Sequence, residues 1–316
     1  MNTTLGMKKR LPNREFRKLI PKLRKKGFYK PKKKRQIDWK RYNKSQTEEA
    51  IILLSKINQL TDSCEVKKLS TRGRKGVDTR ILAKVILLCE ALQLTERQAQ
   101  GWINVLASNI NLTSKLDDRT IGRAYNSLEV QYLLKQVFEK TKDSNGELMG
   151  DGTGIETTRK QNYESDKLTS EYFTSIIDSR EIVQTFDFSG EDERLAIDSL
   201  VEEVEGDSLR LDAGFNDKEL VRKIVEKGII PYVYPKKINR INDGNGWTEM
   251  YLEFFMDVIA WLTEYYQRVH CESFHSAFKR VYGIIRKIRV HSKFVQVSAR
   301  IILHNRARLS YFKKIK

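Results

Sequence analysis

The hydrophobic pattern of the chain changes its period at Ser144-Asn145-Gly146, and this change restricts the fold more than any other feature. Before it, over residues 45–141, proline is absent and apolar side chains recur at steps of three and four, as in helices with one buried face. After it, short apolar runs typical of strands alternate with helical stretches. The sequence therefore predicts an all-α region followed by an α/β region.

Four helical segments are expected in the first region, near residues 46–60, 77–94, 95–108 and 118–140. Thr95 with Gln98 forms a capping-box pattern, and Asp117-Asp118 offers a second helix start. The two helices on either side of residues 109–116 are similar to a helix-turn-helix unit. In such a unit the second helix, from Asp118, would carry Arg119 and Arg123 outward toward DNA. An ordinary helical bundle with solvated charges is the alternative.

In the second region, three strands come first and helices and strands then alternate, which predicts a mixed α/β layout. The strands are expected at 148–151, 172–177, 181–188, 208–211 and 229–234, and the helices at 191–204, 217–227 and 251–280.

Charge is concentrated at the two ends of the chain. Residues 1–44 carry 18 Lys and Arg against two acids, and residues 273–316 carry 12 and no acid. Because the whole chain has a net charge of +18, the middle is acidic. Crowded like charges favour a polyanionic partner, and aromatic residues among the first 44 suit nucleic acid. A solubilising tail, or affinity for ribosomes or membrane surfaces, is the alternative. Three prolines in the first 31 residues predict a disordered arm over 1–44.

Two classes of protein are excluded by composition. The chain contains no apolar run of about 18 residues, which argues against a membrane span. Its basic start is not followed by an apolar segment, which argues against a secretory signal. Three widely spaced cysteines form no disulfide framework, so we expect a reducing, intracellular compartment.

Three acids occupy positions that suit catalysis. Asp151 is expected at the end of the first strand, Asp212 at the end of the fourth, and Glu272 inside the late helix. Taken singly, such acids are usually turn, cap or solvated residues. Convergent carboxylates repel one another unless cations lie between them, and two divalent ions are what phosphodiester chemistry uses.

The late helix strengthens that prediction. Tyr265, Arg268, Glu272 and Lys279 follow the spacing Y-x2-R-x3-E-x6-K, which places them within about 60° on one face of a helix. A carboxylate beside a guanidinium and an ammonium suits a metal held next to DNA phosphates. A zinc site at His270, Cys271 and His275 lacks a fourth ligand, so we expect His275 to face the DNA instead.

These residues resemble the DDE transposases of bacterial and archaeal insertion sequences, in the subgroup with a Y-R-E-K signature. Asp151 in Gly-Asp-Gly-Thr-Gly and Asp212 in Leu-Asp-Ala-Gly-Phe are similar to the two aspartates of that family, and the four residues of the late helix match its signature. The resemblance covers about 146–285 and, more loosely, 73–128. It implies a ribonuclease-H-like core. Only 60 residues separate Asp212 from Glu272, so the large β-rich insertion of some relatives, and its base-flipping contacts, are not expected.

We therefore expect a basic disordered arm over 1–44, a helical DNA-binding domain over 45–145 and a ribonuclease-H-like mixed-sheet α/β domain with a basic extension over 146–316. The resemblance implies a transposase of the prokaryotic cytoplasm that cuts and rejoins double-stranded DNA at terminal inverted repeats and target sites, as a dimer. Asp151, Asp212 and Glu272 are expected to hold two Mg²⁺ or Mn²⁺ ions, and Tyr265, Arg268 and Lys279 to contact DNA. The alternatives are a non-enzymatic DNA-binding regulator and a nuclease without strand transfer.

Overall fold

The structure of the chain is a computed structural model. It describes residues 36–67, 76–113, 115–158, 169–188, 192–234, 244 and 246–312. The predicted disordered arm therefore lies mostly outside the described residues. Its last part is helical, because Trp39–Thr47 forms helix α2, which Asp38 caps.

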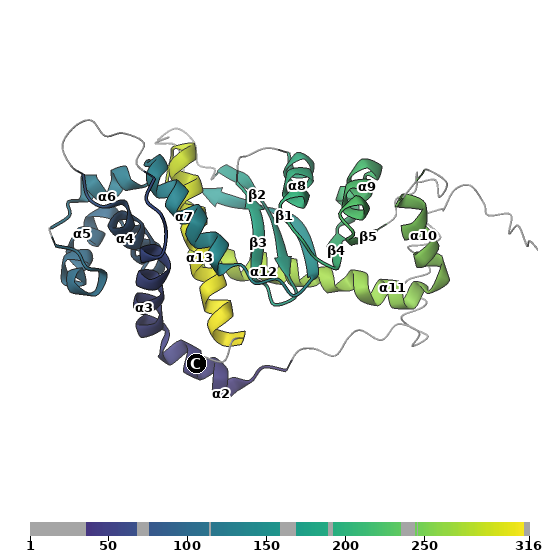
Figure 1. The fold of residues 1–316 in the computed structure, drawn as a ribbon, viewed down its shortest axis with the longest axis horizontal. Helices are drawn as coiled ribbons and strands as arrows, with labels where there is room; N and C mark the ends of the chain where they lie inside the picture. The colour runs from purple at the N-terminus through teal and green to yellow at the C-terminus, as the bar shows by residue number, and fades with distance from the viewer. Residues whose placement is uncertain are drawn as a thin grey trace, which may run out of the picture.

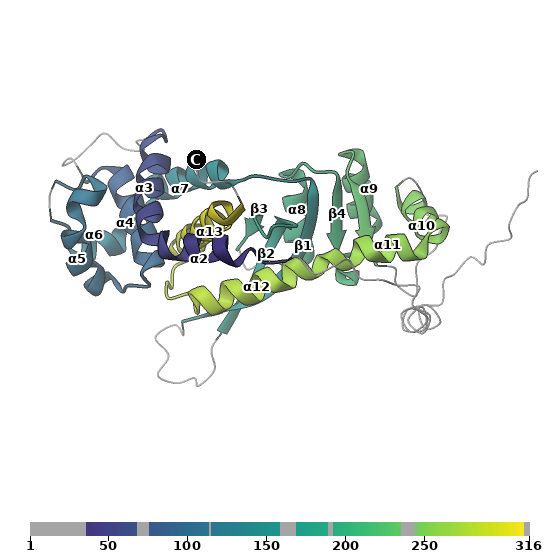
Figure 2. The ribbon, with the colours of Figure 1, turned by 90° about the horizontal axis from the view of Figure 1, so that it is seen from below.

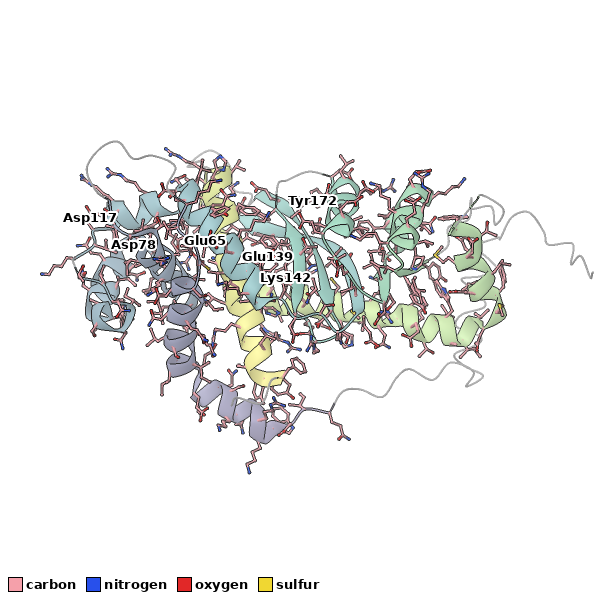
Figure 3. The ribbon with its side chains drawn as sticks, viewed as in Figure 1. Glu65, Asp78, Asp117, Glu139, Lys142 and Tyr172 are labelled. Atoms are coloured by element: carbon pink, nitrogen blue, oxygen red, sulfur yellow. The ribbon has the colours of Figure 1, made fainter. Side chains whose placement is uncertain are left out.

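Short helices make up the part of the chain before the sheet (Figure 1). They are α2, α3 (Glu49–Asp62), α4 (Thr79–Ala91), α5 (Glu96–Val105), the 3₁₀ turn η1 (Ala107–Ile110), α6 (Asp118–Ala124) and α7 (Leu128–Thr141). The Thr95–Gln98 capping box is present, and Asp117, labelled in Figure 3, caps α6. The segment expected at 118–140 is two helices, because the Ser127 hydroxyl starts α7 afresh by accepting the backbone N–H of Val130.

A five-stranded mixed sheet follows, with the strand order β3-β2-β1-β4-β5. Its strands are β1 (Glu147–Thr157), β2 (Thr169–Asp178), β3 (Val183–Asp187), β4 (Ser208–Leu211) and β5 (Ile230–Val233). β1, β2 and β3 are antiparallel neighbours, whereas β4 and β5 run parallel to β1. All five predicted strands exist, and the α/β prediction is confirmed.

The length of β1 was predicted wrongly. β1 does not end at Asp151 but continues for six residues and stays paired with β2 as far as Thr157. The sequence does not predict this continuation, because glycine occupies every second position of Gly150-Asp151-Gly152-Thr153-Gly154 and weakens a strand. Pairing with β2 keeps the segment extended.

Helices cover both faces of the sheet, and Figures 1 and 2 show them on opposite sides. One face carries α8 (Glu193–Glu202) and α9 (Lys218–Glu226). The other is crossed by α11 (Val258–Tyr265), the 3₁₀ turn η3 (Tyr266–Arg268) and α12 (Val269–Tyr282). The late helix expected at 251–280 is thus interrupted. A further break lies between α10 (Trp247–Met256) and α11, where the Asp257 side chain caps the new helix.

The last helix, α13 (Val290–Phe312), returns to pack against α4 and α7. One apolar core runs from these helices to the α12 face of the sheet, and a second fills the α8–α9 face. Asn305 of α13 exchanges two 2.8 Å hydrogen bonds with the backbone of Val183, so its side chain pairs with the first residue of the edge strand β3. The domain boundary near residue 145 stays a prediction. Among the described residues, no helix is both long and apolar enough to cross a membrane.

Candidate functional site

Asp151, Asp212 and Glu272 come together around one guanidinium. Arg268 lies 3.9 Å from the Asp151 carboxylate, 3.5 Å from that of Asp212 and 2.9 Å from that of Glu272, measured between nitrogen and oxygen. The side chains of Asp212 and Glu272 are about half exposed, at 43% and 52%, whereas that of Asp151 is 19% exposed. The three acids predicted from sequence therefore converge on one partly open point.

The sheet register explains why two of these acids meet. Gly150 of β1 is the parallel partner of Leu211, the last residue of β4. The residues that follow, Asp151 and Asp212, therefore stand side by side where β4 stops and β1 continues. α12 packs against β1 and contributes Glu272 from its first turn. Residues 61 and 60 positions apart in the chain thereby form one cluster.

The centre carries more negative than positive charge. Burial raises the pKa of Asp151 to about 6, and the neighbouring Glu193 and Asp212 carboxylates act in the same direction against the pull of Arg268. Burial and the charges of Asp192 and Asp212 also raise the pKa of Glu193. Because charge of one sign is concentrated here, a cation that lies among the acids lowers the free energy of the centre.

Glu193 is a further acid near the site that the sequence did not indicate. It lies in the first turn of α8, on the face of the sheet opposite α12, and a Cβ built on Gly152 would fall 1.8 Å from its Oε1 atom. Gly152 is therefore required for this close approach of carboxylate to strand. The only signal was the glycine itself, since nothing in the sequence pairs residue 152 with residue 193.

The four signature residues do not lie in a single helix, because they are distributed over α11, η3 and α12. Tyr265 is only 4% exposed and stacks on Trp261 with ring centroids 5.4 Å apart. The Arg268 guanidinium also lies over this ring, 5.9 Å from its centroid, so Tyr265 packs against that side chain. Direct contact of Tyr265 with DNA stays a prediction.

Lys279 and His275 are both on α12 but point differently. Lys279 donates a 2.5 Å hydrogen bond to the hydroxyl of Thr153, two residues beyond Asp151 on β1. The expectation that His275 faces DNA is wrong. This ring is 5% exposed and lies 3.0 Å from the Ser175 hydroxyl of β2. Burial and the nearby Lys279 charge lower the pKa of His275 to about 3, so it is a neutral packing residue.

The donor chemistry of the cluster fits Mg²⁺ or Mn²⁺. Asp151, Asp212 and Glu272 offer carboxylate oxygens, which hard divalent cations prefer, from three separate elements around one point. In the part of the chain that the structure describes, no three His, Cys, Asp or Glu side chains are already arranged around an ion position. Metal ligation by these acids is a proposal, taken up below.

The helical region presents the basic side chains that were expected to face outward. Arg119 and Arg123 of α6 are both exposed, as predicted. α5 packs beside α6 and exposes Trp102, of which 55% is accessible. Contact of this surface with DNA stays a prediction.

No protein-family model, curated protein or solved structure shows a significant match to the chain.

Proposed function

We propose that the protein is a DNA transposase with a ribonuclease-H-like catalytic core, which cleaves DNA strands and joins them to target DNA. The observation that carries this proposal is the convergence of Asp151, Asp212 and Glu272 on Arg268. It is supported by a mixed sheet in which β1 is flanked by antiparallel β2 and parallel β4. The resemblance of the same residues to the DDE family is a second, separate support.

In this proposal Asp151, Asp212 and Glu272 would hold two Mg²⁺ or Mn²⁺ ions. When bound, such ions activate water or a 3′-hydroxyl and stabilise the leaving oxygen. The remaining residues act on DNA. Arg268 of η3 contacts the acids and Lys279 of α12 lies beside them at Thr153, and each suits a phosphate oxygen of the bound strand. Tyr265 keeps Arg268 in position through its buried ring.

The charge distribution supports double-stranded DNA as the partner. Twelve Lys and Arg without an acid follow residue 272, and 18 with two acids lie in residues 1–44. Basic segments of this density supply affinity for any duplex through counterion release. Pairing of two terminal inverted repeats implies a dimer on DNA, and the prokaryotic cytoplasm, at the nucleoid, is the compartment that the reaction requires.

The test is a reaction of the full chain with duplexes that span the two boundaries of its gene, with Mg²⁺ or Mn²⁺ and with a chelator. We expect metal-dependent strand cleavage on a denaturing gel and transfer of the cleaved end to a labelled target plasmid. Cleavage without transfer would identify the nuclease alternative. Binding without cleavage under any metal condition would favour the regulator and contradict the proposal.

A further inference from the structure

Arg268 supplies the positive charge at the centre in this structure. Its guanidinium contacts all three acids of the cluster, and its side chain is only 22% exposed. An arginine side chain keeps its charge at any ordinary pH, so this cation cannot leave by losing a proton. It leaves only by moving.

We infer that Arg268 is an internal counter-cation that competes with divalent metal ions for the three carboxylates, and that a DNA phosphate opens the centre to metal by drawing the guanidinium away. The inference rests on the proposed function, because it takes the three acids to be metal ligands. It adds an order of events. The centre stays closed to metal in free protein and accepts metal once DNA is bound.

The competition follows from geometry. A guanidinium and a divalent ion both need the same carboxylate oxygens, and both cannot occupy the point on which Asp151, Asp212 and Glu272 converge. A phosphate is the strongest alternative partner for arginine, since its oxygens match the two parallel N–H donors of the guanidinium. By linkage, a ligand that removes Arg268 raises metal affinity, and metal raises the affinity for that ligand by the same factor.

Aromatic packing holds the backbone at the start of this segment. Tyr265, at the start of the segment, is fixed between Trp261 and Tyr234 by ring contacts of 5.4 and 5.3 Å. Lys279 offers a matched comparison. It carries the same charge on the same run of helix, but it donates to the hydroxyl of Thr153. Removing Lys279 therefore changes the net charge equally without freeing the three acids.

The direct test is calorimetric titration of Mn²⁺ into the full chain without DNA. We expect Arg268→Ala to bind Mn²⁺ about tenfold more tightly than the unaltered protein, or better, because a positive charge is lost within contact distance of the ligands. Lys279→Ala should change the affinity by less than about twofold, because its charge is farther away and screened. Arg268→Lys keeps the charge but loses the paired N–H donors of the guanidinium. Its Mn²⁺ affinity should therefore lie between those of Arg268→Ala and Lys279→Ala. Equal or weaker Mn²⁺ binding by Arg268→Ala would overturn the inference.

Folding of the variants is checked by thermal unfolding with a chelator and with Mn²⁺. Without Arg268, the three carboxylates repel one another. The melting temperature of Arg268→Ala with the chelator should therefore be lower than that of the unaltered chain, and Mn²⁺ should raise it by more. If Arg268→Ala does not fold without metal, Arg268→Lys decides the matter, and an unchanged affinity in that variant overturns the inference.

This test is independent of catalysis. Tighter Mn²⁺ binding by Arg268→Ala in a protein that cleaves no DNA would support the inference and reject the proposed function. Metal-dependent cleavage, together with unchanged Mn²⁺ affinity in Arg268→Ala, would do the reverse.

Discussion

Two arginine–carboxylate clusters in this molecule differ in their balance of charge. In the core between α4 and α13, Arg300 donates to Glu90 at 2.7 Å, and the same carboxylate also accepts from Tyr125 and Gln296. Both charged side chains are about 95% buried or more. At the candidate site, one arginine faces three acids of which two are about half exposed. The first cluster is complete as it stands, whereas the second has acids in excess.

The first cluster has the partners of a structural cluster, whereas the second has those of a candidate binding site. Glu90 joins the helical region to the returning helix α13, and every donor around it is supplied by the chain. Burial of Asp151, together with the neighbouring carboxylates, instead works against folding, since the raised pKa of Asp151 means that the folded state disfavours the charged form. Perturbed carboxyls of this kind cluster at functional sites.

The largest effect on stability is expected from breaking the balanced cluster. Arg300→Ala leaves the Glu90 charge buried without its main partner, which should lower the free energy of unfolding by about 3–5 kcal/mol. Urea unfolding followed by circular dichroism measures this loss. The double variant Glu90→Gln with Arg300→Met removes both charges and should lose much less. A loss below about 1 kcal/mol in Arg300→Ala would show that the cluster does not hold α13 in place.

An opposite and smaller effect is expected at the candidate site. The pKa of Asp151 is raised from 3.8 to about 6. A raised carboxyl pKa means that stability is fully present below the unfolded value and is lost as pH rises through the folded value. Asp151→Asn should therefore increase the free energy of unfolding by about 1–3 kcal/mol at neutral pH with a chelator present. The gain should shrink as the pH falls from about 6 to about 4. A variant less stable than the unaltered chain, or a gain independent of pH, would contradict this account.

The smallest stability effect is expected at Lys279, whose role should appear in DNA binding instead. Lys279→Ala should change the free energy of unfolding by less than about 0.5 kcal/mol, as for other surface substitutions. It should reduce the slope of log affinity against log salt concentration by about 0.9, the loss of one phosphate contact. Lys279→Arg should restore part of the affinity. Normal DNA binding with a markedly lower melting temperature would make Lys279 a structural residue.

The features that local chemistry determines could be predicted from sequence. The caps at Thr95 and Asp117 act within three residues, and the strands show in short apolar runs. Asp212 follows β4 directly, as expected, because β4 ends where its apolar run ends. The meeting of Asp151 and Asp212 could be predicted because both follow short apolar runs that form parallel neighbouring strands, and the register of those strands places the two residues side by side.

Features that depend on distant contacts could not be predicted. The extension of β1 past Asp151 depends on pairing with β2, and the approach of Glu193 to Gly152 depends on the packing of α8. Tyr265 turns inward because α11 brings it to Trp261 and to Tyr234 beyond β5. His275 turns inward because Ser175 of β2 lies opposite. In each case a contact with another element of the fold decides the outcome, and the local sequence does not show that contact.

The central claim is that three carboxylates act together in metal-dependent DNA cleavage. The measurement that tests this claim is the initial rate at which the protein cleaves the DNA at its gene boundaries in the presence of Mn²⁺. The test variants are Asp212→Asn and Glu272→Gln, and Glu219→Gln is the control. Glu219 is an exposed acid of α9 that pairs with Arg222, so Glu219→Gln makes the same change of charge outside the site. We predict that each site variant loses at least about 100-fold in rate while binding the DNA normally, because charge stabilisation at the reacting phosphate is lost. The control should cleave at the unaltered rate, and a site variant that keeps more than about a tenth of that rate would contradict the claim.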